Sequence, residues 1–180
     1  RDASLDLAAN ARLFAMLNIA LADAGIAAWN AKYTENFWRP ITAIQEAESD
    51  GNPATVADPT WTPLLITPPF PEYVSGHSTY SAAAAEILTA TFGDVAFTTS
   101  SVGLPGVTRS FTSFAQAAAE AGRSRIFGGI HFEFANQDGQ ALGRSVAGVV
   151  IEAFSTTTDT RAPVVTITSP SPNAVVPSSP

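Results

Sequence analysis

The stretch SGHSTYSAAAAEILTATF, residues 75–92, is the part of the sequence that most strongly indicates the fold. It opens with a serine that can cap a helix, it comes directly after a proline-rich loop, and Gly93 follows its last residue. Most of its side chains are small, and small side chains allow two helices to approach closely. We therefore predict a helix here that packs tightly against other helices.

Similar patterns on both sides of this stretch extend the prediction to a whole domain. Apolar residues recur at three- and four-residue spacing, between glycine or proline boundaries, in residues 4–31, 110–127 and 136–154. A further short helix is expected at 41–49. The loop from Gly51 to Pro71 contains six prolines, which exclude a helix or a central strand. We expect residues 1–155 to form an all-α helical bundle without a parallel sheet, and an irregular stretch after Gly93.

The character of the chain changes after Phe154. Residues 162–168 alternate like a strand, and the last eleven residues are rich in proline and serine. We interpret residues 156–180 as a linker or as the start of a β-domain of the immunoglobulin-like kind. A tail that wraps around the helical domain is the alternative.

The composition excludes several classes of function. The formal net charge of −7 excludes nucleic acid as a partner, because binding to a phosphate backbone needs a basic surface. The absence of cysteine excludes disulfides and thiolate metal sites. No uninterrupted apolar run is long enough for a membrane span, so we expect no transmembrane segment. For the compartment we expect an extracytoplasmic or secreted location, and the oligomeric state stays open.

The scarce cationic residues fall into three clusters, which contain both histidines and the only lysine of the chain. The first cluster runs from Lys32 to Pro40 and has Lys32 and Arg39 seven residues apart. On a continuous helix this spacing would place both side chains on one face. Taken alone, such a pair is more often a solvated basic edge.

The other two clusters pair a histidine with features that bind anions. In the second, Ser75 and Gly76 lie where a loop becomes a helix, and the free amides of a helix start attract anions. His77 in the first turn is a candidate proton donor or acceptor. The third places Arg125 six residues before His131. Alternatively, Ser75 only caps the helix, and the histidines and Arg125 have structural roles.

Together the three clusters resemble a known signature. They match the signature of the type 2 phosphatidic acid phosphatase superfamily, which has three parts. These parts are a lysine, six residues and arginine-proline; then serine-glycine-histidine; then serine-arginine, five residues and histidine. The surrounding phrases resemble its vanadium-dependent haloperoxidase branch: Phe37-Trp38-Arg39-Pro40, Phe70-Pro71-Glu72-Tyr73 and Gly128-Gly129-Ile130-His131-Phe132. The resemblance implies a helical bundle of the haloperoxidase type. The resembled enzymes are far longer, so the chain is expected to be the C-terminal part of a larger helical protein.

The resemblance implies a role for each residue of the signature. Vanadate, or phosphate in the same site, would be bound by Lys32, Arg39, Ser75, Gly76, Arg125 and His131. His131 would be the one protein ligand of the vanadium, His77 would move protons, and Lys32 would polarise bound peroxide. The implied activity is oxidation of a halide by hydrogen peroxide to hypohalous acid, which then attacks a small organic acceptor.

Two alternatives stay open. The first is a soluble acid phosphatase of the superfamily, in which His131 attacks a phosphate ester and His77 protonates the leaving oxygen. The second is a non-catalytic oxyanion-binding domain. It is motivated by Ala135, because the family usually has an acid four residues after the last histidine. We expect Asn136, Asp138 or a backbone carbonyl to replace that acid as the partner of the His131 ring.

Overall fold

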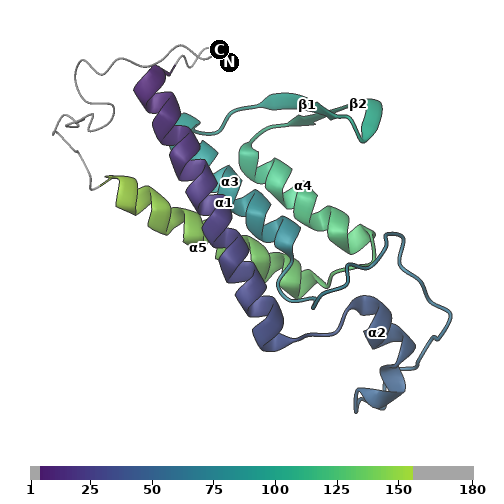
Figure 1. The fold of residues 1–180 in the computed structure, drawn as a ribbon. Coiled ribbons are helices and arrows are strands. Elements are labelled where there is room, and N and C mark those ends of the chain that lie inside the picture. Colours follow the sequence, from purple (N-terminus) through teal and green to yellow (C-terminus); the bar gives the residue numbers. More distant parts are fainter. Residues whose placement is uncertain (1–4, 156–180) are drawn as a thin grey trace, which may run out of the picture.

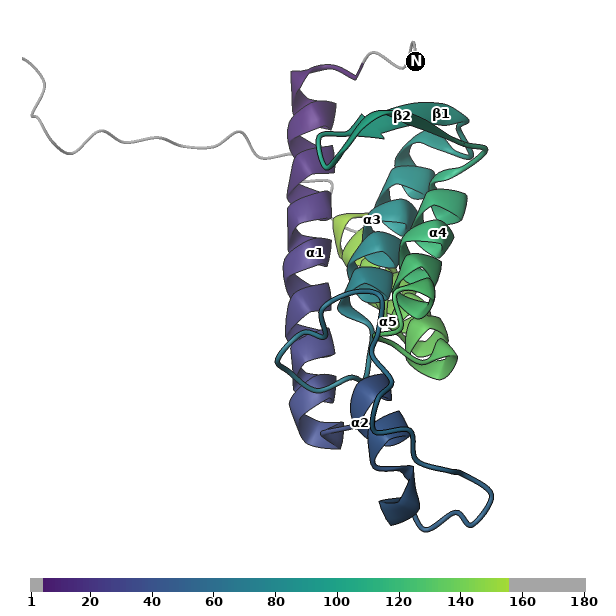
Figure 2. The same cartoon turned by 90° about the vertical axis from the view of Figure 1, so that its right-hand side faces the viewer.

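The computed structural model describes residues 5–155, and the expected linker at 156–180 lies outside the described residues. Four long helices form a bundle: α1 (Leu7–Glu35), α3 (Gly76–Phe92), α4 (Phe114–Phe127) and α5 (Glu133–Ser155). A short helix α2 (Pro40–Gln45) and one 3₁₀ turn (Ala47–Ser49) follow α1. Helix α3 contacts α1, α4 and α5 and occupies the centre of the bundle (Figures 1 and 2). The prediction of an all-α bundle is confirmed.

Three of the four long helices begin at a side-chain cap. Asp6, Ser75 and Ser113 cap α1, α3 and α4, each accepting a hydrogen bond from a backbone amide of the first turn. Helix α1 ends at Glu35 and is followed by Asn36, whose φ of 46° is left-handed, a common conformation after the last helical residue. Helix α3 ends at Gly93, as predicted.

The core of the bundle is built largely from alanine. On α1 a stripe at four-residue spacing, Ala20, Ala24 and Ala28, has no exposed surface. Ala20 and Ala24 pack with Ala83 and Ile87 of α3 and Ala147 of α5. Because Lys32 is the next residue of the same stripe, the pattern that buries the alanines also carries a lysine into the interior.

Two expectations about local structure were wrong. Residues 97–111 are not irregular: β1 (Phe97–Ser101) and β2 (Leu104–Phe111) form an antiparallel hairpin, which takes the first residues of the helix expected at 110–127. The helix expected at 41–49 divides into α2 and the 3₁₀ turn. Lys32 and Arg39 do not share one helix, because α1 ends at Glu35 and Arg39 precedes α2.

Helix α1 also bears on the expectation of no transmembrane segment. By length and composition alone, the segment Leu7–Gln45 is apolar enough to cross a membrane, with a mean hydropathy of 1.4. The same test is passed by core helices of proteins that do not enter membranes. The buried stripe of α1 packs against α3 and α5, and 28 % of the apolar window is buried inside the protein, so one such helix is weak evidence for a membrane span.

Candidate functional site

Lys32 is fully buried at the end of α1. Its Nζ donates to the carbonyl oxygens of Pro71 (3.1 Å), Glu72 (3.0 Å) and Val74 (2.5 Å). Burial, and secondarily the nearby Arg39 charge, lowers the pKa of Lys32 to about 8, although Glu72 acts in the opposite direction. The ammonium form has three N–H donors, one for each carbonyl, so Lys32 fastens the proline-rich loop to α1 and offers the site a charge.

Arg39 is also buried and connects the same loop with the segment before α5. Its Nε donates to the Phe70 carbonyl (3.0 Å) and its Nη1 to the Ile130 carbonyl (2.8 Å). The same Nη1 lies 3.1 Å from Nε2 of His131. Burial lowers the pKa of Arg39, and the Glu72 carboxylate raises it. The fork of Arg39 therefore places a cation directly beside the histidine ring.

His131 has its second ring nitrogen on a carboxylate. Its Nδ1 lies 2.6 Å from Oε1 of Glu72, which also accepts from the Phe132 amide at 2.9 Å. His131 is 6 % exposed and Glu72 is not exposed at all. Burial lowers the pKa of His131, while Glu72 raises it in part. The ring is therefore held on both sides, by Glu72 at Nδ1 and by Arg39 at Nε2.

The expected partners of the His131 ring were wrong. Asn136 instead contacts Ser78 (2.8 Å) and Glu133 (3.0 Å), and Asp138 accepts from the Tyr73 hydroxyl at 3.1 Å. Both residues lie on α5, which begins only at Glu133, and both are engaged elsewhere. Glu72 is the residue that the sequence reasoning missed.

Ser75, Gly76 and His77 lie where the loop enters α3. Ser75 is buried and caps the helix: its Oγ lies 3.4 Å from the Ser78 amide and 2.9 Å from the Ser78 hydroxyl. Gly76 is the first residue of α3, and amides of a first turn have no acceptor within their own helix. His77 is exposed at this end of the helix, and partial burial together with the Arg125 charge lowers its pKa.

One cavity of about 340 Å³ collects four of the seven predicted residues. Gly76, His77, Arg125 and His131 line it, together with Ser81 and a largely apolar wall: Trp29, Pro68, Phe70 and Tyr80. The two histidines therefore face a common volume from α3 and from the segment before α5. Since a water molecule takes about 30 Å³ of liquid, the cavity has room for a tetrahedral oxyanion.

The other three predicted residues surround this cavity without lining it. Arg39 contacts the cavity-lining His131 ring. Lys32 donates to carbonyls of the proline-rich loop, and Ser75 caps the start of α3. Nε of Arg125 is buried and has no hydrogen-bond partner. A buried unpaired donor costs roughly 1–3 kcal/mol, and an anion in the cavity is a fitting acceptor for it. These donors and charges fit a vanadate or phosphate group.

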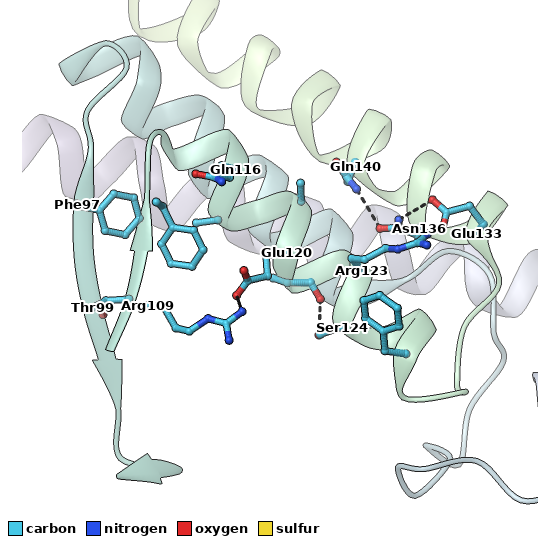
Figure 3. Close-up of a pocket in the computed structure, with 15 residues that line it drawn as sticks. Phe97, Thr99, Arg109, Gln116, Glu120, Arg123, Ser124, Glu133, Asn136 and Gln140 are labelled. Atoms are coloured by element: carbon cyan, nitrogen blue, oxygen red, sulfur yellow. Dashed lines mark hydrogen bonds and ion pairs between the residues drawn. The ribbon is translucent and has the colours of Figure 1, made fainter. Parts of the chain in front are cut away.

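A larger cavity, of about 970 Å³, lies away from these residues. It is formed by the hairpin, α4 and the start of α5, and Figure 3 shows Arg109 and Glu120 paired within it. Arg123 and Glu133 form a second ion pair there. None of the seven predicted residues lines this cavity.

The helical bundle thus gathers two histidines and buried cations around one small cavity. Residues 12–160 match the family described as "VCPO second helical-bundle domain". The chain belongs to this family and is therefore a vanadium haloperoxidase-related protein.

Individual relatives agree with this assignment. The chain is 40 % identical over 83 residues to the vanadium chloroperoxidase of Curvularia inaequalis, covering 41 % of this chain and 13 % of that protein. A solved bacterial vanadium-dependent iodoperoxidase is 42 % identical with a TM-score of 0.69, over 78 % of this chain and 32 % of the other. An apo-type bacterial vanadium-dependent chloroperoxidase shares the fold at 20 % identity and a TM-score of 0.67, over 84 % of this chain and 38 % of the other. The chain thus spans about a third of the solved relatives.

Proposed function

We propose that this domain carries the vanadate site of a haloperoxidase that oxidises halide with hydrogen peroxide. The observation that supports this most is the shared cavity, where His77, Arg125 and His131 meet and Arg39 touches the His131 ring. Vanadate, when bound there, supplies a Lewis-acidic centre at which peroxide becomes able to oxidise a halide.

Each residue contributes a separate physical effect in this proposal. Arg125 supplies the free donor, and Arg39 a second cation beside His131. Lys32 contributes its charge from behind the loop, because its three donors already have carbonyl acceptors. Gly76 offers its amide at the start of α3, and Ser75 fixes that start.

The two histidines divide the remaining work. His131 is uncharged at neutral pH, since burial lowers its pKa, and it can offer the Nε2 lone pair to the oxyanion. His77 is more accessible, and its lowered pKa keeps it able to accept a proton from peroxide.

Phosphatase activity is the second candidate, because a neutral Nε2 beside two arginines also suits attack on a phosphate ester. The test is to add orthovanadate, peroxide and bromide or iodide, and to follow halogenation of a phenol dye. Hydrolysis of p-nitrophenyl phosphate is measured in parallel without vanadate. Vanadate-dependent halogenation supports the haloperoxidase, and hydrolysis alone supports the phosphatase.

A matched control separates these activities from contamination. Asp138→Asn changes an acid outside the cavity and should retain the activity of the wild type. His131→Ala should remove it. Binding of vanadate without either reaction would support the non-catalytic alternative, and absence of vanadate binding would contradict the proposal.

A further inference from the structure

Glu72 connects all three segments that carry the signature. Its carboxylate contacts Nδ1 of His131 and the Phe132 amide, in the third segment. Its backbone amide donates to the Phe37 carbonyl (3.1 Å) and its carbonyl accepts from Lys32, both in the first segment. Glu72 itself belongs to the loop that leads into the second.

The contacts of the His131 ring determine which nitrogen carries the proton. A guanidinium can only donate, so Arg39 at 3.1 Å requires a lone pair on Nε2 of His131. The proton of the neutral ring then lies on Nδ1, where Glu72 accepts it at 2.6 Å. Both neighbours are therefore compatible with the Nδ1–H tautomer, and Glu72 is the one that accepts its proton.

The burial of Glu72 also requires compensation. A carboxylate without exposed surface is costly unless charges and donors surround it. Lys32 and Arg39 supply the charges, and the ring and the Phe132 amide supply donors to Oε1. Oε2 has no hydrogen-bond partner, so the hydrogen bonds of this carboxylate are concentrated on the side of His131.

We propose that Glu72 is the positioning residue of His131: it fixes the Nδ1–H tautomer, so that Nε2 carries the lone pair, which Arg39 contacts in this structure and which an oxyanion would take over from Arg39 on binding. In this chain the acid that orients the His131 ring is Glu72, from the loop 59 positions before it. The resembled family usually has that acid four residues after the histidine, where this chain has Ala135. Glu72 acts through the ring and does not line the cavity. Only the binding arm of the test below depends on the proposed function.

The spectroscopic arm uses the fact that the chain has only two histidines. Ring-¹⁵N histidine labelling gives two ring patterns, and His77→Gln leaves that of His131 alone. At neutral to mildly alkaline pH we expect the Nδ1–H tautomer in the wild type. In Glu72→Gln, whose amide can donate to Nδ1 as well as accept from it, the preference for Nδ1–H should weaken, and Nε2–H should gain population although Arg39 still opposes it. Asp138→Asn is the matched control and should leave the pattern unchanged, because Asp138 contacts Tyr73 instead.

The binding arm compares vanadate, which can form a bond to Nε2, with sulfate, which binds by charge and hydrogen bonds only. Outer partners of a ligating histidine are typically worth about 10–100-fold in affinity. We therefore expect Glu72→Gln to lower the ratio of vanadate to sulfate affinity by this factor in calorimetry. A purely electrostatic role would instead strengthen both anions, because a negative charge is removed.

Three results would overturn the inference: an Nε2–H tautomer in the wild type, an unchanged tautomer in Glu72→Gln, or a parallel rise of both affinities. Circular dichroism and thermal unfolding establish that each variant is folded, and the isosteric Gln is the primary variant for this reason. If the wild type binds no vanadate, the proposed function fails, while the spectrum still decides the role of Glu72.

Discussion

Replacing Gly139 with alanine tests how closely α5 packs against the start of α3, where the anion site begins. A Cβ at this position would lie 2.8 Å from the Ser75 carbonyl oxygen and 3.1 Å from both Ser78 Cβ and Thr79 Oγ1. The nearest atom belongs to the backbone and cannot rotate away. The helices must therefore move apart, or Ser75 and Gly76 must shift.

Gly148, on the same helix, provides the matched control, because a Cβ there meets nothing within 4 Å. Both substitutions gain about the same helix propensity, roughly 1 kcal/mol, so this term cancels between them. Overpacking typically costs about 1–3 kcal/mol. At about 2–4 °C per kcal/mol for a chain of this size, Gly139→Ala should melt roughly 2–12 °C below Gly148→Ala.

The same strain should reach the anion site. Because 1.4 kcal/mol is a factor of ten in a binding constant, sulfate or vanadate affinity should fall by up to about a hundredfold if Ser75 and Gly76 absorb the whole strain. Differential scanning calorimetry and anion titration measure the two effects. If Gly139→Ala equals Gly148→Ala in both melting temperature and affinity, the packing argument is refuted.

Three further predictions concern the cations and histidines. His131→Ala should abolish tight vanadate binding in calorimetry, whereas His77→Ala should keep it and slow halogenation by about 10²–10⁴-fold; equal loss of vanadate in both would reverse the roles. Oxyanion affinity should fall as pH rises past about 8, where Lys32 loses its charge, and Lys32→Met should show no such step in titrations. Because the pKa of Lys32 in the folded chain lies below its ordinary value of 10.5, deprotonation of Lys32 favours the folded chain between these two pH values, so unfolding would not explain the step. Arg39→Lys should lower the free energy of unfolding in urea by roughly 1.5–3 kcal/mol for each charged hydrogen bond lost, and an unchanged midpoint would contradict the structural role of the fork.

The sequence predicted the parts of the fold that depend on local patterns. The capping serine and the terminal glycine placed α3 at residues 76–92, as observed. The hairpin at 97–111 was missed because its residues are mostly exposed, so no alternation of buried and solvated side chains marked the strands. Gly103, Pro105 and Gly106 indicated irregular structure, although glycines also occur in hairpins.

Glu72 was missed for a different reason. Proximity in the sequence indicated residues of the following helix, Asn136 and Asp138, as side-chain partners of His131. Tertiary packing instead brings the proline-rich loop against the segment before α5. The available signal was that Asp58 and Glu72 are the only charged residues between positions 51 and 72.

The charges around the cavity explain why such a carboxylate stands behind His131 rather than within the cavity. Lys32, Arg39 and Arg125 bring three positive charges into a chain whose net charge is −7, and Glu72 brings one negative charge. With both histidines neutral, the sum of three and minus one is plus two, which complements a dianionic oxyanion. Placed in the cavity, the same carboxylate would compete with that anion for Arg125. Placed behind the ring, it lowers the cost of burying Lys32 and Arg39 beside each other and leaves the donors that face the cavity free.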